Sequence, residues 1–286
     1  MDRHKIQLSS RHMGGEFLFQ IFPGTSKGHK EIESIAHLAF DEVKRIEELL
    51  TVFKDSPFND INKYAGIRPV EVDAETLKLV KESLDLSLAT NGAFDISFSS
   101  QPGFIGYKNI EVDEKNSTIF LPRTEMRINL GGIGKGYAVD CGFEVLRRFG
   151  LSNFYFNGAG DIRVHSRTDA PRSWKIGVRN PFSVNQNQAC AYLEISNGAL
   201  ATSGTYVKGG HIINPESGTS CDELVSVTVC SDSAQTSDTT ATVVMIMGKQ
   251  KGMDYLNQHN FNAFAIDCEG HVHRTERSFA ALENRL

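Results

Sequence analysis

The order of the helical and strand patterns is the feature of this sequence that most constrains its fold. Apolar residues recur at helical spacing mainly in the first half of the chain, whereas short apolar segments dominate from Phe154 onwards. Helices are predicted at about 30–50, 74–90, 136–149, 234–247 and 251–258. Because helices and strands do not alternate regularly as βαβ units, we expect a mixed α+β fold and not a doubly wound parallel sheet.

Short apolar segments bounded by turn residues predict the strands. Two strands are expected near 5–10 and 16–22, joined by the turn RHMGG, and two more near 118–121 and 127–130. The segment TVFKDSPFNDINKYAG, residues 51–66, is expected to be a loop. In the second half, strands are predicted at FYF, DIRVH, WKIGV, AYLEI, GALATSG, HIIN, LVSVTVC, AFAID and HVHR.

The composition excludes several classes of protein. The 286 residues carry a net charge of −5, so no global basic field indicates nucleic acid or an anionic membrane as a partner. No run approaches the roughly 20 apolar residues that a membrane helix needs, and no membrane insertion is expected. Five scattered cysteines without a C-x-x-C pair, and an N-terminus without an apolar signal core, indicate a cytoplasmic protein with reduced thiols.

The stretch Met126–Asp140, MRINLGGIGKGYAVD, places four glycines and one lysine within residues 131–136. Glycines there cost stability unless the backbone needs a positive φ or a close approach. The spacing fits neither a Walker A loop nor the G-x-G-x-x-G fingerprint. A strand that ends in glycines before a helix can still direct N–H groups at an anion, with Lys135 as a cation. A tight turn without a ligand explains the same residues equally well.

Asp238 and Thr242 lie four residues apart in the segment SDTTATVVMIMG, so they share one face of a predicted helix. A carboxylate and a hydroxyl are hard oxygen donors that suit Mg²⁺, which completes its shell with water and substrate phosphate oxygens. An aspartate near a helix N-terminus also commonly caps the helix or interacts with its dipole. The pair alone leaves both interpretations open.

Three histidines are considered for other roles. His211 follows two glycines in ATSGTYVKGGHIINPESG, in which small residues around Ser203 again allow a close approach to the backbone. A lone histidine in such a place is more often structural than catalytic. His271 and His273 share one face of a strand near Cys268, which is an incomplete set of zinc ligands. A surface strand explains these two histidines better than zinc does.

Nine segments of the chain resemble, in the same order, those of the ApbE-type FAD:protein FMN transferases. They are HMGGEF, DSPFNDIN, NGAFDIS, INLGGIGKGYAVD, FNGAGDIRV, WKIGVRNP, ALATSGTY, HIINPESG and SDTTATVVMIMG. Each segment is a weak signal alone, but together they cover most of the chain. The resemblance implies one ApbE-like domain over residues 1–286, with two lobes that divide near residue 150 and a ligand cleft between them.

The resemblance also implies an enzyme that binds FAD with Mg²⁺, cleaves the FAD diphosphate and moves FMN onto a Thr or Ser hydroxyl of a target flavoprotein, releasing AMP. By position in the family's segments, the carbonyl of Gly132 would join Asp238 and Thr242 as metal ligands. Lys135 and His211 would be the catalytic residues. The residues that contact FAD would be Met13, Ala93, Phe94, Asp95, Asn129, Lys135, Ser203, His211 and Ile212.

These implied roles agree with the chemistry. Phosphoryl transfer depends on charge neutralisation and alignment, which Mg²⁺ and Lys135 would supply, while His211 would take the hydroxyl proton or assist the leaving group. The chain departs from the family where Asn129 and Asn214 replace aspartates, which keeps a hydrogen-bonding group but removes its charge. Two alternatives use the same residues: an FAD diphosphatase with water as the acceptor, and a module that binds FAD without turnover.

Overall fold

The structure is a computed structural model that describes residues 5–22, 27–185, 188–205 and 221–276. These residues form two compact units. The larger unit contains the described residues up to Lys44, those from 135 to 205 and those from Cys221 onwards, and the smaller unit is Arg45–Gly134. Helices α1 (His29–Leu50) and α4 (Gly134–Arg148) each contribute residues to both units.

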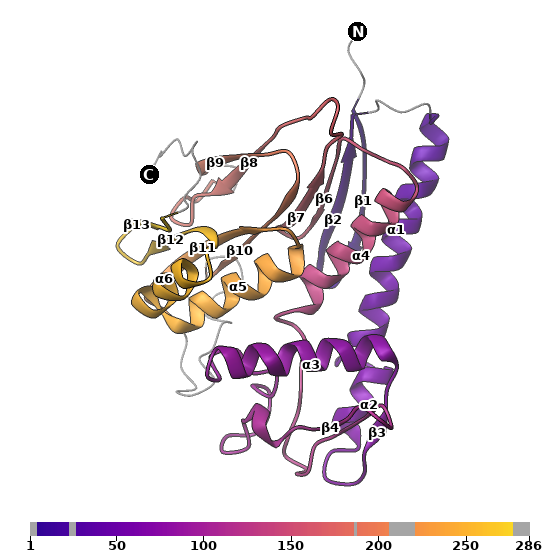
Figure 1. Cartoon of the computed structure of the whole chain (residues 1–286), viewed down its shortest axis with the longest axis vertical. Coiled ribbons are helices and arrows are strands. Elements are labelled where there is room, and N and C mark those ends of the chain that lie inside the picture. The colour runs from indigo at the N-terminus through magenta and orange to yellow at the C-terminus, as the bar shows by residue number, and fades with distance from the viewer. Residues whose placement is uncertain (1–4, 23–26, 186–187, 206–220, 277–286) are drawn as a thin grey trace. The chain divides into compact units, whose positions relative to one another are not determined.

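An eight-stranded antiparallel sheet is the main element of the larger unit (Figure 1). Its strands follow in the order β1-β2-β6-β7-β10-β11-β12-β13, and every neighbouring pair runs antiparallel. They are β1 (Ile6–His12), β2 (Gly15–Ile21), β6 (Phe154–Gly158), β7 (Asp161–His165), β10 (Gly198–Gly204), β11 (Leu224–Ser231), β12 (Asn262–Asp267) and β13 (Val272–Arg274).

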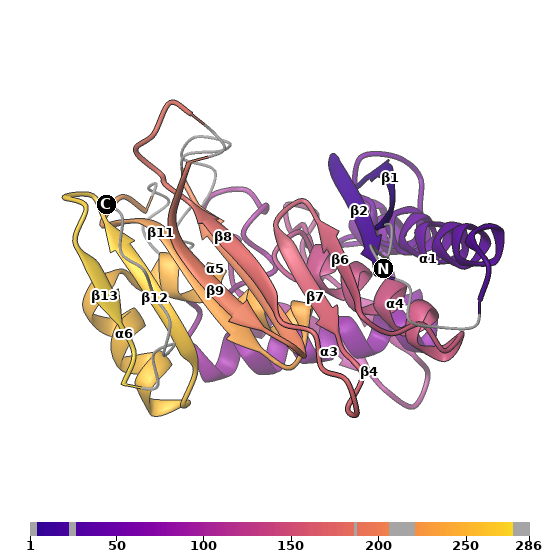
Figure 2. The same cartoon turned by 90° about the horizontal axis from the view of Figure 1, so that it is seen from above.

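Different elements cover the two faces of this sheet, as strand β12 illustrates. Ala263 and Ala265 pack with buried residues of helices α5 (Ala234–Met247) and α6 (Lys249–Gln258). The alternate residues Phe264 and Ile266 pack with the two-stranded ribbon of β8 (Trp174–Arg179) and β9 (Ala189–Ile195). Since successive side chains of a strand point to opposite faces, the sheet lies between these helices and the ribbon (Figure 2).

Aromatic side chains join helices α1 and α4 to strand β6. The ring centroid of Phe40 on α1 lies 5.9 Å from that of Phe156, and the centroid of Phe143 on α4 lies 5.1 Å from that of Phe154. Gly142 permits this packing, because a Cβ at this position would lie 2.6 Å from the ring of Phe156. Most of the apolar face that the sequence predicts for α1 is buried, but its member Leu38 is 45% exposed.

The smaller unit contains two helices and a small antiparallel sheet in the order β3-β5-β4. Its elements are α2 (Pro57–Lys63), β3 (Val70–Glu71), α3 (Ala74–Ala89), the 3-10 turn η1 (Tyr107–Asn109), β4 (Glu111–Asp113) and β5 (Thr118–Phe120). Helix α3 begins after Asp73, whose side chain accepts a hydrogen bond from the N–H of Thr76. This cap fixes the start of α3 where the sequence predicts it.

The strand predicted at 127–130 is wrong, because side chains and not a neighbouring strand satisfy this backbone. The side-chain amide of Asn62 donates to the carbonyl of Ile128 at 2.9 Å and accepts from its N–H at 2.7 Å. The hydroxyl of Ser100 makes the same two types of bond with Arg127. The partners come from distant parts of the sequence, so the apolar pattern of the segment could not distinguish it from a strand.

The loop predicted for 51–66 is also wrong, because it contains helix α2. The hydroxyl of Ser56 accepts a hydrogen bond from the N–H of Asn59 at 2.9 Å, and Pro57 occupies the first helical turn. A serine cap followed by proline is a start signal for a helix. The sequence carries this signal, but α2 is too short for its apolar spacing to stand out.

The predicted α+β class is confirmed. Helix α5 has the predicted bounds, and α3, α4 and α6 differ from theirs by one or two residues. The strand predicted at HIIN lies outside the described residues. Within the described part of the chain, no helix is long and apolar enough to cross a membrane.

We expect Asn62→Ala to destabilise the protein by about 2–3 kcal/mol, because it leaves the buried N–H and C=O of Ile128 without partners. Urea unfolding measures this loss. Asn116→Ala removes an asparagine from an exposed turn and serves as the matched control, with an expected change within about 0.5 kcal/mol. Equal effects of the two variants would contradict the role assigned to Asn62.

Candidate functional site

Two tight turns and the end of a third strand lie at one end of the eight-stranded sheet. The turn Met13–Gly14 closes the β1–β2 hairpin with φ of 50° and 76°, and Ala159–Gly160 closes the β6–β7 hairpin with φ of 52° and 107°. The N–H of Ala159 donates to the carbonyl of Glu16 at 2.9 Å, so the two turns lie side by side. The antiparallel register of β10 with β7 brings Ser203 to the same end.

Lys135, in the first turn of α4, pairs with two carboxylates. Its ammonium forms an ion pair with Asp161, the first residue of β7, and lies 3.4 Å from a carboxylate oxygen of Asp238 on α5. The side chains of Asp161 and Asp238 are only 1% and 9% exposed. Burial alone would lower the pKa of Lys135, but the two negative charges outweigh it and raise the pKa. The lysine is therefore held in its charged form.

The two buried carboxylates share one ammonium, so each disfavours the ionisation of the other. Burial and the charge of Asp238 raise the pKa of Asp161 well above its usual value, although Lys135 acts in the opposite direction. Thr242 lies one helical turn beyond Asp238, and its hydroxyl oxygen is 3.2 Å from that of Ser203. The carboxylate oxygens of Asp238 and the hydroxyl oxygens of Thr242 and Ser203 are hard donors, chemically suited to a small divalent cation such as Mg²⁺.

Gly136 explains how the first turns of α4 and α5 come together. A Cβ at this position would lie 2.6 Å from the carbonyl oxygen of Ala234 and 2.7 Å from the Cα of Gln235, so only glycine fits without a shift of the backbone. Its N–H donates to a carboxylate oxygen of Asp238 at 3.2 Å. The last glycine of the sequence GGIGKG therefore permits a close approach of two helices and a bond to a predicted metal ligand.

Other predicted FAD-binding residues lie in the smaller unit. A Cβ at Gly132 would lie 3.0 Å from the ring of Phe94, which is 5% exposed. The N–H of Asn129 donates to the carbonyl of Ile96 at 2.8 Å, so the segments that contain NGAFD and LGG lie side by side. The side-chain oxygen of Asn129 accepts the N–H of Gly131 at 2.7 Å, a bond that an aspartate could accept equally well.

Asp95 organises its own loop in this unit. Its carboxylate accepts hydrogen bonds from the N–H of Ser97 at 2.7 Å and the N–H of Tyr107 at 2.9 Å. Ala93, two residues earlier, donates its N–H to the carbonyl of Thr90 at the end of α3. The carboxylate of Asp95 therefore shapes the loop that follows it, between Ser97 and Tyr107.

The structure thus gathers the predicted site residues into two groups. The larger unit brings together Lys135, Asp238, Thr242 and Ser203, with Met13 in a turn at the same end of the sheet, and the smaller unit brings together Ala93, Phe94, Asp95, Asn129 and Gly132. His211 and Ile212 lie outside the described residues. The roles of all these residues in binding and catalysis stay predictions.

Asp161 is a site residue to which the sequence interpretation gave no role. It lies within the segment FNGAGDIRV, and an aspartate directly after a glycine-containing turn is usually exposed. Here the two-residue turn Ala159–Gly160 starts a strand whose first side chain points into the protein, toward Lys135. An acidic residue that opens an alternating apolar strand was the available signal.

The histidines considered for zinc surround Asp267 instead. The carboxylate of Asp267 accepts hydrogen bonds from the N–H groups of Glu269 and His271, and lies 2.8 Å from Nε2 of His273 and 3.4 Å from the ammonium of Lys249. Burial would raise the pKa of Asp267, but these hydrogen bonds outweigh it and lower the pKa. The carboxylate therefore organises the β12–β13 turn, and Cys268 is exposed beside it.

The chain belongs to the ApbE family, whose family model matches residues 13–102 and 98–265. Among the relatives, the FAD:protein FMN transferase of Klebsiella pneumoniae is 30% identical over 289 residues, covering 90% of this chain and 87% of the relative. The FAD:protein FMN transferase of Vibrio cholerae is 26% identical over 284 residues, with 87% and 83% covered.

Solved structures confirm the ApbE-like fold. The ApbE protein of Thermotoga maritima superposes with a TM-score of 0.84 at 26% identity and covers 96% of this chain and 97% of its own. The flavin transferase ApbE from Vibrio cholerae superposes with a TM-score of 0.79 at 24% identity, over 96% and 97% of the two chains. The second likeness is one of fold alone.

We expect Gly136→Ala to destabilise the protein by about 1–3 kcal/mol, because the added methyl group meets the backbone of α5. Thermal or urea unfolding measures this loss. Gly28→Ala is the matched control, since a Cβ there meets no atom within 4 Å. If Gly136→Ala were as stable as this control, the close contact between the first turns of α4 and α5 would be refuted.

The lowered pKa of Asp267 predicts a pH-dependent contribution to stability. The contribution is complete above the pKa of an unfolded aspartate, about 3.9, and disappears as the pH falls through the lower folded value. Asp267→Asn should therefore reduce the free energy of unfolding at about pH 7, and its difference from wild type should shrink below about pH 4. Urea unfolding over this range tests the prediction, and a difference that does not change with pH would contradict it.

Proposed function

We propose that this chain is a Mg²⁺-dependent FAD:protein FMN transferase, which attaches FMN through a phosphoester to a Thr or Ser side chain of a target flavoprotein and releases AMP. Membership of the ApbE family and the names of the relatives support this activity. The observation that carries the proposal is the convergence of Lys135, Asp161 and Asp238. Thr242 lies one helical turn from Asp238 on α5 and contacts Ser203. The cytoplasmic location expected from the sequence belongs to the same proposal.

Asp238 and Thr242 would hold Mg²⁺ together with the carbonyl of Gly132. When bound, Mg²⁺ supplies neutralisation of the negative charge on the FAD diphosphate. Asp238 is suited to this role because its carboxylate is buried at the first turns of α5 and its position is fixed by the N–H of Gly136. The hydroxyl of Thr242 is oriented by its contact with Ser203.

Lys135 would bind a phosphate oxygen of the diphosphate. Its ammonium carries three donors, and Asp161 holds it at a fixed place while the remaining donors can face a ligand. Because Asp161 and Asp238 raise the pKa of Lys135, its positive charge persists throughout the neutral range. A fixed cation of this kind stabilises charge as it develops on the phosphoryl group and the leaving AMP.

The bond changes of the proposed reaction balance as a substitution at one phosphorus. The acceptor hydroxyl oxygen forms a bond to the phosphorus of the FMN portion, and the bond from this phosphorus to the bridging oxygen of the diphosphate breaks, so AMP leaves with that oxygen. His211 would take the proton of the acceptor hydroxyl. Met13, Ala93, Phe94, Asp95, Asn129, Ser203 and Ile212 would contact FAD.

We expect Asp238→Ala to abolish Mg²⁺-dependent FMN transfer, because the variant loses a charged ligand of the metal. Co-expression with a candidate flavoprotein, followed by mass spectrometry for added FMN, measures the transfer. Asp254→Ala removes an exposed aspartate of α6 and should leave the transfer unchanged. Transfer by Asp238→Ala at the wild-type rate would refute the metal assignment.

Product analysis with purified protein separates FMN transfer from the two alternatives, an FAD diphosphatase and a module that binds FAD without turnover. Purified protein is incubated with FAD and Mg²⁺, with and without the acceptor, and AMP and free FMN are quantified. AMP that appears only with the acceptor supports transfer. Free FMN in equal amount with and without the acceptor would indicate a diphosphatase, and no AMP under either condition would indicate a module that binds FAD without turnover.

A further inference from the structure

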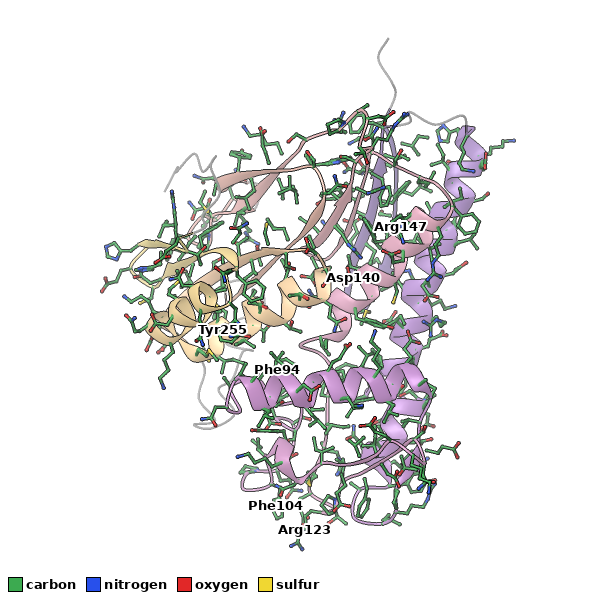
Figure 3. All side chains as sticks on the ribbon, viewed as in Figure 1. Phe94, Phe104, Arg123, Asp140, Arg147 and Tyr255 are labelled. Carbon is green, nitrogen blue, oxygen red and sulfur yellow. The ribbon has the colours of Figure 1, made fainter. Side chains whose placement is uncertain are left out.

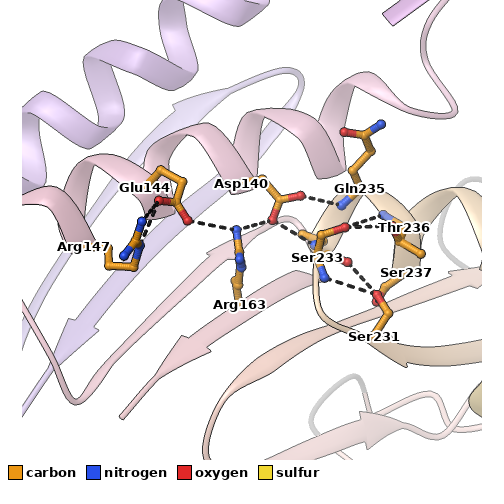
Figure 4. A network of polar contacts seen from close by, with 10 residues as sticks. Asp140, Glu144, Arg147, Arg163, Ser231, Ser233, Gln235, Thr236 and Ser237 are labelled. Carbon is orange, nitrogen blue, oxygen red and sulfur yellow. Dashed lines mark hydrogen bonds and ion pairs between the residues drawn. The ribbon is translucent and has the colours of Figure 1, made fainter. Parts of the chain in front are cut away.

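Asp140 connects helix α4 to the start of helix α5. One carboxylate oxygen accepts the N–H of Ala234 at 2.9 Å, and the other accepts the N–H of Gln235 at 3.0 Å (Figure 4). Asp140 lies on α4, five residues after Lys135, where this helix approaches the start of α5 (Figure 3). Asp140 of α4 therefore accepts hydrogen bonds from the first two backbone N–H groups of α5.

The N-terminus of α5 is closed by this arrangement. The third N–H group, that of Thr236, donates to the hydroxyl of Ser233, which is the local cap of the helix. The first three N–H groups of α5 are thus satisfied by Asp140 and Ser233. The helix that carries Asp238 and Thr242 consequently presents its N-terminal dipole to a fixed carboxylate of α4 and not to a ligand.

Arg163 of strand β7 holds Asp140 in place. Its guanidinium donates to the carboxylate at 2.9 Å, lies 3.6 Å from Glu144 on the next turn of α4, and stacks 3.9 Å from the ring centre of Phe143. Burial raises the pKa of Asp140, whereas the N–H groups of α5 and the charge of Arg163 oppose this effect. These partners therefore stabilise the ionised form of the Asp140 carboxylate.

Strand β7 contacts α4 at two points of opposite charge. Asp161 and Arg163 are two residues apart and point to the same face of the strand, where they pair with Lys135 and Asp140. Two residues of a strand span about 6.7 Å and five residues of a helix about 7.5 Å, so the spacings match. The same strand that fixes Lys135 also fixes the carboxylate that anchors α5.

We propose that Asp140, held by Arg163, is a positioning residue that sets the place of Asp238 and Thr242 relative to Lys135. This inference rests on the proposed function, because it assigns Asp140 a role in metal affinity through α5. The contact acts on the metal ligands indirectly: it locks the first turn of α5 to α4, and Asp238 follows in the next turn, where Gly136 and Lys135 contact it.

Metal binding in the absence of turnover tests the proposal. Mn²⁺ is titrated into the purified full chain in the presence of ADP, which offers a diphosphate but no flavin, and free Mn²⁺ is measured by electron paramagnetic resonance. Asp140→Asn keeps the size of the side chain but sets an NH₂ group against an N–H of α5. We expect it to raise the dissociation constant of Mn²⁺ about tenfold, at the lower end of effects seen for groups that orient metal ligands.

Ser233→Ala is the matched control because it also removes a cap of α5, but one that does not connect the helix to α4. It should lower the thermal stability and leave the dissociation constant of Mn²⁺ within about twofold of wild type, since a cap contributes to helix stability alone. Wild-type affinity in Asp140→Asn, or equal weakening in both variants, would overturn the positioning role.

Two further variants complete the experiment. Arg163→Lys keeps the charge but loses the planar fork, so it should weaken Mn²⁺ binding in the same direction as Asp140→Asn, and it replaces that variant if Asp140→Asn does not fold. Wild-type affinity in Arg163→Lys would then overturn the proposal. Asp238→Ala separates the proposed metal site from the positioning role of Asp140. If Asp238→Ala binds Mn²⁺ like wild type, the assignment of the metal site is wrong. If Asp238→Ala loses Mn²⁺ binding while Asp140→Asn binds normally, only the positioning role is refuted.

Discussion

The ion pairs of Lys135 with Asp161 and Asp238 are the interaction on which the candidate site depends. They join the start of α4, the start of β7 and the start of α5, three segments that are separated in sequence. Two carboxylates with so little exposure require a positive partner, since an unpaired buried charge is strongly destabilising. The same requirement makes the place attractive to a second cation, which is the physical basis of the metal site proposed for Asp238 and Thr242.

The glycines on either side of this lysine are needed for separate physical reasons. Gly136 permits the backbone of α4 to approach α5, and Gly132 lies against the ring of Phe94. The N–H of Gly131 donates to the side-chain oxygen of Asn129, and that of Gly134 donates to the carbonyl of Leu130. The N–H of Gly136 donates to the carboxylate of Asp238. The turn is therefore ordered by its own hydrogen bonds, and the charge of Lys135 is the most direct means by which it could attract an anion.

The sequence predicts those parts of the fold and the site that depend on local patterns. Periodicity locates α1, α3, α4, α5 and α6, and the separation of Asp238 and Thr242 places them on one face of α5. Local pattern fails as a guide where residues distant in sequence decide the structure. The side chains of Asn62 and Ser100 bind the backbone around Ile128, where the sequence predicts a strand. Asp161 meets Lys135 only because the β6–β7 turn places it there. The contact of Asp140 with α5 is equally invisible, because it joins residues 94 positions apart.

The proposed metal site is tested most sharply by locating a divalent cation, by anomalous scattering, in crystals of the protein grown with Mn²⁺ and ADP. We expect a peak within coordination distance of the Asp238 carboxylate and the Thr242 hydroxyl, with a phosphate oxygen of ADP near the ammonium of Lys135. A cation bound elsewhere, with Asp238 still paired only to Lys135 and Gly136, would refute the site.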